Sequence, residues 1–320
     1  MKIRHALLLL ALALAVPVAQ AQTAEWPARP VRIVVSFPPG GFTDVIARMF
    51  AQRLSEEFGQ QFIVDNRPGA GGTMGNEFVA NSKPDGYTTV LMPASFAATP
   101  ALYQLTYDPI KAIAPVSMIA AGGFVLVVHP SVKAGSLKEL IELARAKPGA
   151  LNFGSSGAGT DLHLALELFR QLTNADMVHV PYKGIAPAIN DLLGGAIHLM
   201  LSTPQSIAVH IKSGRVRPLA VTSEQRSPAM PELPAISELV PGYSARAWFG
   251  LGATAGTPNE IIVRLNRSVV RILGEPEVQQ RLRSGGVEPA PTTPDEFART
   301  IARDFAMWSK VIKSGNIKVN

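Results

Sequence analysis

The chain has 320 residues, with 30 lysines and arginines against 24 acidic residues, and it contains no cysteine. The lack of cysteine excludes disulfides, thiolate nucleophiles and thiolate metal ligands. The basic surplus is mild and includes no run of lysine or arginine, so it does not indicate a nucleic-acid-binding protein, although it is compatible with attracting anionic solutes.

Residues 1–21 predict a cleaved signal peptide. Lys2 and Arg4 precede an uninterrupted apolar run at 6–16, and Ala-Gln-Ala at 19–21 fits the small-x-small cleavage pattern. The apolar run is too short to span a bilayer, and no stop-transfer pattern follows it. We therefore expect an exported protein cleaved after Ala21, whose net charge is +4 (28 basic minus 24 acidic residues).

The rest of the chain alternates short apolar strands with amphipathic helices, which is the pattern of an α/β fold. In the first part, strands are expected at 31–35, 62–65 and 87–92, and helices follow the loops at 37–42 and 66–72. Thr43 and Asp44 are predicted to cap the first of these helices.

A similar strand, glycine loop and helix start recur in the second half. A strand is expected at 151–153 and a flexible loop at 154–159, and Thr160 and Asp161 begin a helix that continues to Leu172. Further strands are expected at 124–128, 178–180, 218–222 and 247–252, and further helices at 137–146, 187–193, 257–273 and 294–311.

The return of a strand near residue 248 predicts two lobes. One lobe is expected to comprise residues 22–125 together with 249–320, and the other to comprise residues 126–248. The two strand crossings between them would form a hinge.

The glycine loops at 38–41 and 154–159 are candidates for an anion site. The first N–H groups of a helix have no intrahelical acceptor, and the helix dipole adds partial positive charge there. Glycine lets the backbone approach a ligand closely. Two such loops facing each other would suit a dicarboxylate, or a carboxylate with a polar tail. On these residues alone, the alternative that both loops are only tight turns stays open.

Catalytic, metal and cofactor motifs are not found. Ala158 stands where the nucleophile-elbow pattern needs its last glycine, and Leu162 stands where a dinucleotide fingerprint needs a small residue. The histidines lack a metal-ligand spacing with nearby acids. We therefore predict no catalytic residue, no metal and no cofactor. A secreted hydrolase using Ser156 or Lys183 is the least favoured alternative.

The loop motifs resemble those of a known family. They are WPARPVRIVV at 26–35, FPPGG at 37–41, NRPGAGG at 66–72, PDGY at 84–87, YDP at 107–109, NFGS at 152–155, GT at 159–160, HVPYKG at 179–184 and LAVT at 219–222. In this order they resemble the Bug-type family, the extracytoplasmic solute receptors associated with tripartite tricarboxylate transporters.

The resemblance implies a two-lobed periplasmic-binding-protein fold of type II. It implies a monomeric periplasmic receptor that captures a small carboxylate, such as a dicarboxylate, an amino acid or an aromatic acid. Backbone amides, hydroxyls and water would hold the ligand in the cleft. The receptor would deliver it to integral-membrane permease subunits, or alternatively signal to a membrane sensor. Family motifs place first-lobe contacts at Phe37, Gly41, Phe42, Thr43, Asp44, Ala94 and Ser95, and second-lobe contacts at Ser155, Ser156, Gly157, Thr160, His163, Tyr182, Lys183 and Thr203.

Overall fold

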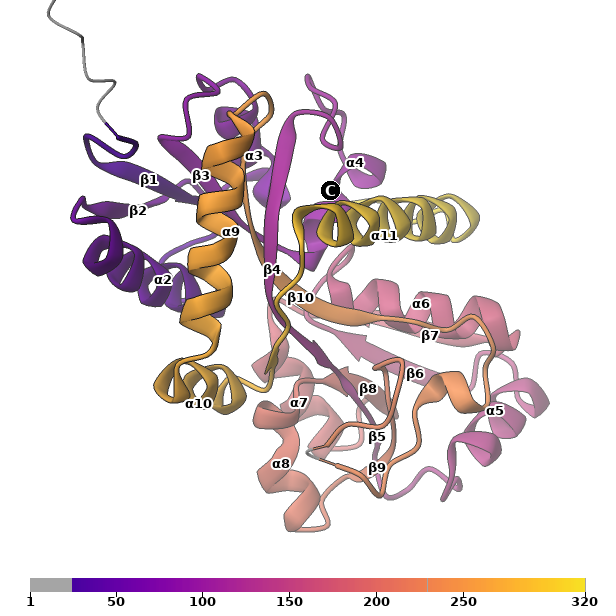
Figure 1. The fold of residues 1–320 in the computed structure, drawn as a ribbon. Helices are drawn as coiled ribbons and strands as arrows, with labels where there is room; N and C mark the ends of the chain where they lie inside the picture. The colour runs from indigo at the N-terminus through magenta and orange to yellow at the C-terminus, as the bar shows by residue number, and fades with distance from the viewer. Residues whose placement is uncertain (1–24, 229, 320) are drawn as a thin grey trace, which may run out of the picture.

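The protein forms two β-sheets with helices around them (Figure 1). The computed structural model describes residues 25–228 and 230–319, so the predicted signal peptide lies outside the described residues. The first sheet has the order β11-β4-β10-β3-β1-β2, with strands β1 (Val31–Val35), β2 (Phe62–Asn66), β3 (Thr88–Pro93), β4 (Ile113–Gly123), β10 (Arg246–Thr254) and β11 (Glu288–Pro289). The second sheet has the order β7-β6-β8-β5-β9, with strands β5 (Val125–Val128), β6 (Leu151–Ser155), β7 (Met177–Pro181), β8 (Leu199–Ser202) and β9 (Arg217–Val221).

The helices connect and cover these strands. They are α2 (Phe42–Phe58), α3 (Thr73–Ala80), α4 (Thr99–Leu102), α5 (Leu137–Ala146), α6 (Asp161–Thr173), α7 (Ile185–Leu193), α8 (Pro204–Lys212), α9 (Asn259–Leu273), α10 (Pro276–Ser284) and α11 (Pro294–Ser314), with short 3-10 turns at Ala70–Gly72, Ala94–Ala97 and Ile236–Glu238. Among the described residues, no helix combines the length and apolarity needed to span a membrane.

Each sheet contains a parallel strand–helix–strand unit, as the sequence predicts. β1 pairs in parallel with β2 and β3, and β6 pairs in parallel with β7 and β8. Four of the five residues of β1 are buried, because a central parallel strand is covered on both faces. The carboxyl ends of β1 and β6 lead through glycine loops into α2 and α6. The topology therefore gives each lobe one helix start at the end of a central strand.

Two antiparallel strands carry the chain between the sheets. β4 and β10 pair along almost their whole length, from Arg246 opposite Gly123 to Thr254 opposite Ile113. Figure 1 shows them running side by side between the two groups of strands. β4 continues after Phe124 into β5 of the second sheet. The expected lobe boundaries at 125/126 and 248/249 remain a prediction; the second falls inside β10.

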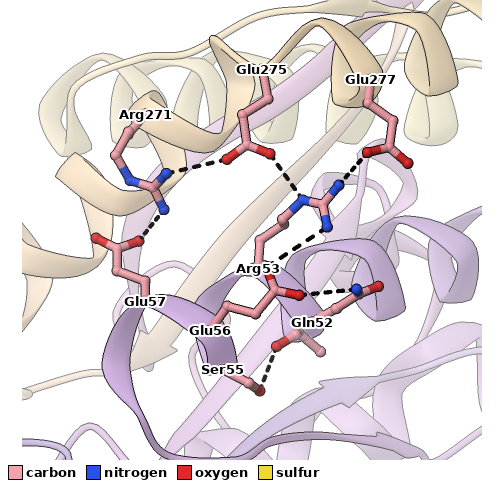
Figure 2. Close-up of polar contacts among 9 residues, drawn as sticks. Gln52, Arg53, Ser55, Glu56, Glu57, Arg271, Glu275 and Glu277 are labelled. Atoms are coloured by element: carbon pink, nitrogen blue, oxygen red, sulfur yellow. Dashed lines mark hydrogen bonds and ion pairs between the residues drawn. The ribbon is translucent and has the colours of Figure 1, made fainter.

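The first lobe combines segments from both ends of the chain. An ion-pair cluster joins α2 to α9 and α10 (Figure 2). Arg53 Nε lies 2.9 Å from Glu275 Oε2, and its Nη2 lies 2.6 Å from Glu277 Oε2. Arg271 Nη2 lies 2.7 Å from Glu57 Oε2. These pairs link residues more than 200 positions apart in the sequence, so the C-terminal helices belong structurally with the first strands.

Candidate functional site

A cavity of about 520 Å³ lies between the two lobes. Its walls come from both helix starts, from the crossing strands, from the 3-10 turn after β3 and from segments near the C-terminus. The lining residues are Phe37, Phe42, Thr43, Gly71, Pro93, Ser95, Thr99, Leu102, Tyr103, Gly122, Gly123, Phe124, Ser156, Ala158, Gly159, Thr160, Asp161, Leu162, Thr203, Gln205, Ser206, Ala247, Phe249, Gly285, Gly286, Val287 and Val319. The volume is that of an ordinary small-molecule site.

The start of α2 reaches this cavity without a side-chain cap. Gly41 is the N-cap residue, and the first intrahelical bond runs from the Val45 amide to the Gly41 carbonyl at 3.0 Å. The amides of Phe42 and Thr43 precede that bond and have no intrahelical acceptor. The prediction that Thr43 and Asp44 cap the helix is wrong, because α2 begins one residue earlier and both lie inside its first turn. This helix start therefore presents unpaired donors to a ligand.

Asp44 braces the first loop from behind. Its Oδ2 accepts hydrogen bonds from the Gly40 amide and from Arg48 Nε, both at 2.9 Å. Its Oδ1 accepts one from Asn66 Nδ2 at 2.9 Å. Burial opposes ionisation of Asp44, but the hydrogen bonds from Arg48, Gly40 and Asn66 outweigh it and lower the pKa of this carboxyl below its usual value. Asp44 is thus an ionised, neutralised support for the loop.

The start of α6 is built in the same way on the opposite side of the cavity. Thr160 is the N-cap residue, but its hydroxyl donates to the Gly157 carbonyl at 2.8 Å and caps no helix amide. The first intrahelical bond runs from the Leu164 amide to the Thr160 carbonyl at 2.9 Å. The amides of Asp161 and Leu162 precede it and lie at the cavity wall. α5, α8 and α11 are capped by the side chains of Ser136, Thr203 and Thr293, whereas α3, α7, α9 and α10 have no side-chain cap.

A stack of imidazoles braces the second loop. His163 Nδ1 accepts a hydrogen bond from the Gly159 amide at 2.9 Å, and the His163 ring lies 3.7 Å from the His179 ring at an angle of 10°. His179 Nε2 lies 2.7 Å from Ser155 Oγ. Burial and the neighbouring His163 lower the pKa of His179 to about 4, so this imidazole is neutral at pH 7.

The two braces occupy equivalent positions. Asp44 and His163 are each the third residue of their helix, and each accepts the amide of the glycine four residues earlier. Gly40 and Gly159 have φ values of +86° and +76°, which side chains other than glycine rarely adopt. Each loop is therefore stabilised by a side chain of its own lobe, and the first-turn amides at the cavity wall keep no intrahelical acceptor.

The structure brings seven of the fifteen expected contact residues to the cavity wall. They are Phe37, Phe42, Thr43, Ser95, Ser156, Thr160 and Thr203. The other eight do not line the cavity. Gly41 is the exposed N-cap of α2, Gly157 lies within the second loop, and Lys183 is exposed. Asp44 and His163 are the braces, and Ala94 is 4% exposed.

Two of these eight have hydroxyl groups that point to partners within the protein. The Tyr182 hydroxyl donates to Asp191 Oδ2 at 2.7 Å. The Ser155 side chain is fully buried, and its hydroxyl donates to the Gly157 carbonyl at 3.0 Å. Ser155 Oγ also contacts His179, but this serine is buried and does not line the cavity. Among residues 25–228 and 230–319, no three histidine or acidic side chains gather in a metal-binding group.

Sequence reasoning missed most of the remaining wall. Gly122, Ala247 and Phe249 come from the crossing strands, and the Gly285–Val287 turn and Val319 come from the end of the chain. Asp161 was read only as a helix start, although its acidic side chain beside a glycine loop was visible in the sequence. It is the one charged side chain that lines the cavity among the described residues.

Comparison with known proteins agrees with this architecture. A sequence profile described as "Tripartite tricarboxylate transporter family receptor" matches residues 46–317. Protein BugT of Bordetella pertussis is 38% identical over 298 residues, which cover 92% of this chain and 91% of BugT. Among solved structures, R. palustris Rpa4515 with adipate is 39% identical with a TM-score of 0.75, covering 92% of this chain and 99% of that one.

A second solved relative contains a different small acid. MatC from Rhodopseudomonas palustris with bound malate is 29% identical with a TM-score of 0.72, covering 90% of this chain and all of that one. The family consists of periplasmic solute receptors and not of enzymes. The expected two-lobed fold and the expected family are both confirmed. This chain belongs to the family of receptors for tripartite tricarboxylate transporters.

Proposed function

We propose that this protein captures a small carboxylate-bearing solute in the cavity between its lobes and delivers it to a tripartite tricarboxylate-type membrane transporter. The observation that carries the proposal is the uncapped start of α2 at the wall of a cavity that α6 lines from the other lobe. Unpaired first-turn amides and the positive end of a helix dipole bind anions. The hydroxyls of Thr43 and Ser95 add donors at the same wall.

Such a site needs no arginine clamp to reach useful affinity. Each charge-assisted hydrogen bond contributes about 1.5–3 kcal/mol net. Four or five of these, less the cost of ordering the ligand, provide the roughly 8 kcal/mol that a micromolar complex requires. The adipate and malate named for the two solved relatives are acids of the size this cavity accommodates.

The cellular setting is part of the proposal. We infer that the signal peptide is cleaved after Ala21 and that the mature protein acts as a monomer in the periplasm. Integral-membrane permease subunits would then receive the ligand when the lobes open. The family supports this setting, since its receptors are periplasmic.

A thermal-shift screen tests the function. Mono-, di- and aromatic carboxylates are each compared with the primary amide of the same shape. A ligand that binds only the native state raises the melting temperature. We expect at least one carboxylate to raise it in a concentration-dependent way, and its amide to do markedly less. If no carboxylate raises it, or if the amides do as well, the proposed function is wrong.

A further inference from the structure

The side chain of Asp161 stands alone in the cavity wall. No other charged residue lines the cavity among the described residues, and no hydrogen bond or ion pair joins its carboxylate to any of them. An unpaired carboxylate is unfavourable in a wall that otherwise consists of glycines, hydroxyls, the amide of Gln205 and apolar groups such as Phe37 and Phe249. A ligand with two carboxylates would therefore bring its second negative charge close to that of Asp161.

The two helix starts are consequently unequal in charge. In α2, the carboxylate of Asp44 is turned away from the cavity and is neutralised by Arg48 at 2.9 Å. The amides at that end keep their attraction for an anion. In α6, the unpaired charge of Asp161 offsets the positive end of its own helix dipole. A ligand anion is therefore favoured at α2, and a cation is favoured at α6.

Within the part of the chain that the structure describes, the groups around Asp161 supply no compensating positive charge to it. Asp304 on α11 faces it and is itself held by Trp248 Nε1 at 2.8 Å and Arg303 Nε at 3.1 Å. Burial and this second carboxylate raise the pKa of Asp161 to about 6, so it is still mostly ionised at pH 7.5. His163 on α6 and His179 on β7 engage the second loop.

We propose that Asp161 selects ligands that bear a cationic nitrogen in addition to the carboxylate, with the carboxylate at the start of α2 and the nitrogen against Asp161. The ligand class is then a zwitterion with an apolar body, such as an ω-amino acid, whose ammonium lies at the far end of the chain from the carboxylate. This inference rests on the proposed function, because it assumes that the cavity binds a carboxylate at all.

Matched ligand series test the inference. Isothermal titration calorimetry at pH 7.5 compares straight-chain acids of four, five and six carbons whose far end is ammonium, methyl or carboxylate. In the six-carbon set these are 6-aminohexanoate, hexanoate and adipate. We expect the ammonium member to bind roughly tenfold or more tightly than the methyl member, with the diacid weakest.

Two variants distinguish an effect of the charge at Asp161 on binding from an effect of the net charge of the protein. Asp161→Asn should abolish the preference for ammonium and strengthen diacid binding roughly tenfold. Asp176→Asn removes the same charge from an exposed position outside the cavity and should leave the order unchanged. Circular dichroism and melting curves establish that both variants are folded.

The outcomes distinguish this inference from the proposed function. A diacid that binds best to the wild-type protein, or an order that Asp161→Asn leaves intact, overturns the selection by Asp161 while the carboxylate receptor stands. Binding of other carboxylates but of no ammonium member also overturns it. If no carboxylate of any kind binds, both the inference and the proposed function fail.

Discussion

Asp161 connects function to stability at the scale of a single residue. Its pKa is about 6 in the folded protein, against an ordinary 3.8. The folded state therefore holds a proton more tightly than the unfolded state, and its stability falls as pH rises from 4 to 6. The lost stability stays lost above that window, where the carboxylate is ionised and unpaired. A residue that costs stability in this way is typical of a ligand site.

Replacing this carboxylate should make the protein more stable. We expect Asp161→Asn to raise the free energy of unfolding at pH 7.5 by about 1–3 kcal/mol. The lower values apply because the substitution also removes the favourable interaction of this carboxylate with the dipole of α6. At pH 4 the difference should nearly vanish. Urea unfolding at both pH values measures it, with Asp176→Asn as control. A variant no more stable than wild type at pH 7.5 would contradict the account of Asp161.

His163 allows the brace of the second loop to be tested atom by atom. Asparagine places its oxygen near the position of Nδ1, where it can accept the Gly159 amide, whereas glutamine reaches the position of Nε2. Both variants lose the ring stacked on His179.

We therefore expect His163→Gln to weaken carboxylate binding roughly tenfold, because an unpaired amide costs about 1–3 kcal/mol. His163→Asn should lose much less. Calorimetric titration of both variants with the best carboxylate of the screen measures the difference. Equal losses would mean that the imidazole serves only as packing and that its hydrogen bond to Gly159 is unimportant.

At the scale of elements, the second loop forms part of the cavity and can be used to block it. Ala158 is exposed and lines the cavity, whereas Ala186 is exposed on α7 and does not. Ala158→Trp should abolish the thermal shift produced by a carboxylate, because the indole fills the ligand's space. Ala186→Trp adds the same group elsewhere and should respond like the wild type. A normal shift in Ala158→Trp would place the ligand outside this cavity.

Whether an element could be predicted depends on whether the pattern that specifies it is local in the sequence. β1 and α6 were predicted because a short apolar run and a helix start are local patterns. β4 was not predicted, although it is the longest strand among the described residues. Pro115 lies where the pairing with β10 shifts register, and the strand ends in Gly122 and Gly123, so the segment lacks the regular alternation typical of a strand. Its stability comes from pairing with a strand more than 120 residues away, which no local pattern reveals.

The same reason limits the prediction of the site. The two loops carry recognisable motifs, so Thr43, Ser156 and Thr160 were placed near the cavity from sequence. Motif matching could not tell which loop residues face the ligand and which brace the loop, since Asp44 and Thr43 are neighbours with opposite orientations. Val319 reaches the wall only through tertiary packing and has no motif.

At the scale of the whole molecule, the lobes are joined by more than a pair of strands. α11 packs against α6, and Gln171 Nε2 donates to the Val311 carbonyl at 3.0 Å. Figure 1 shows α11 lying next to α6 at the junction of the lobes. One apolar cluster also continues between the lobes, from Val90 of β3 to Leu126 of β5. The cavity is therefore framed by both lobes and by the strands that connect them.

A crystal structure of the complex with the carboxylate that raises the melting temperature most would test the central claim directly. We expect a carboxylate oxygen within about 3.2 Å of a first-turn amide, Phe42 or Thr43 at the start of α2. We expect no lysine or arginine side chain in contact with it. A carboxylate bound outside the cavity, or held there by a lysine or arginine and not by helix amides, would contradict the account.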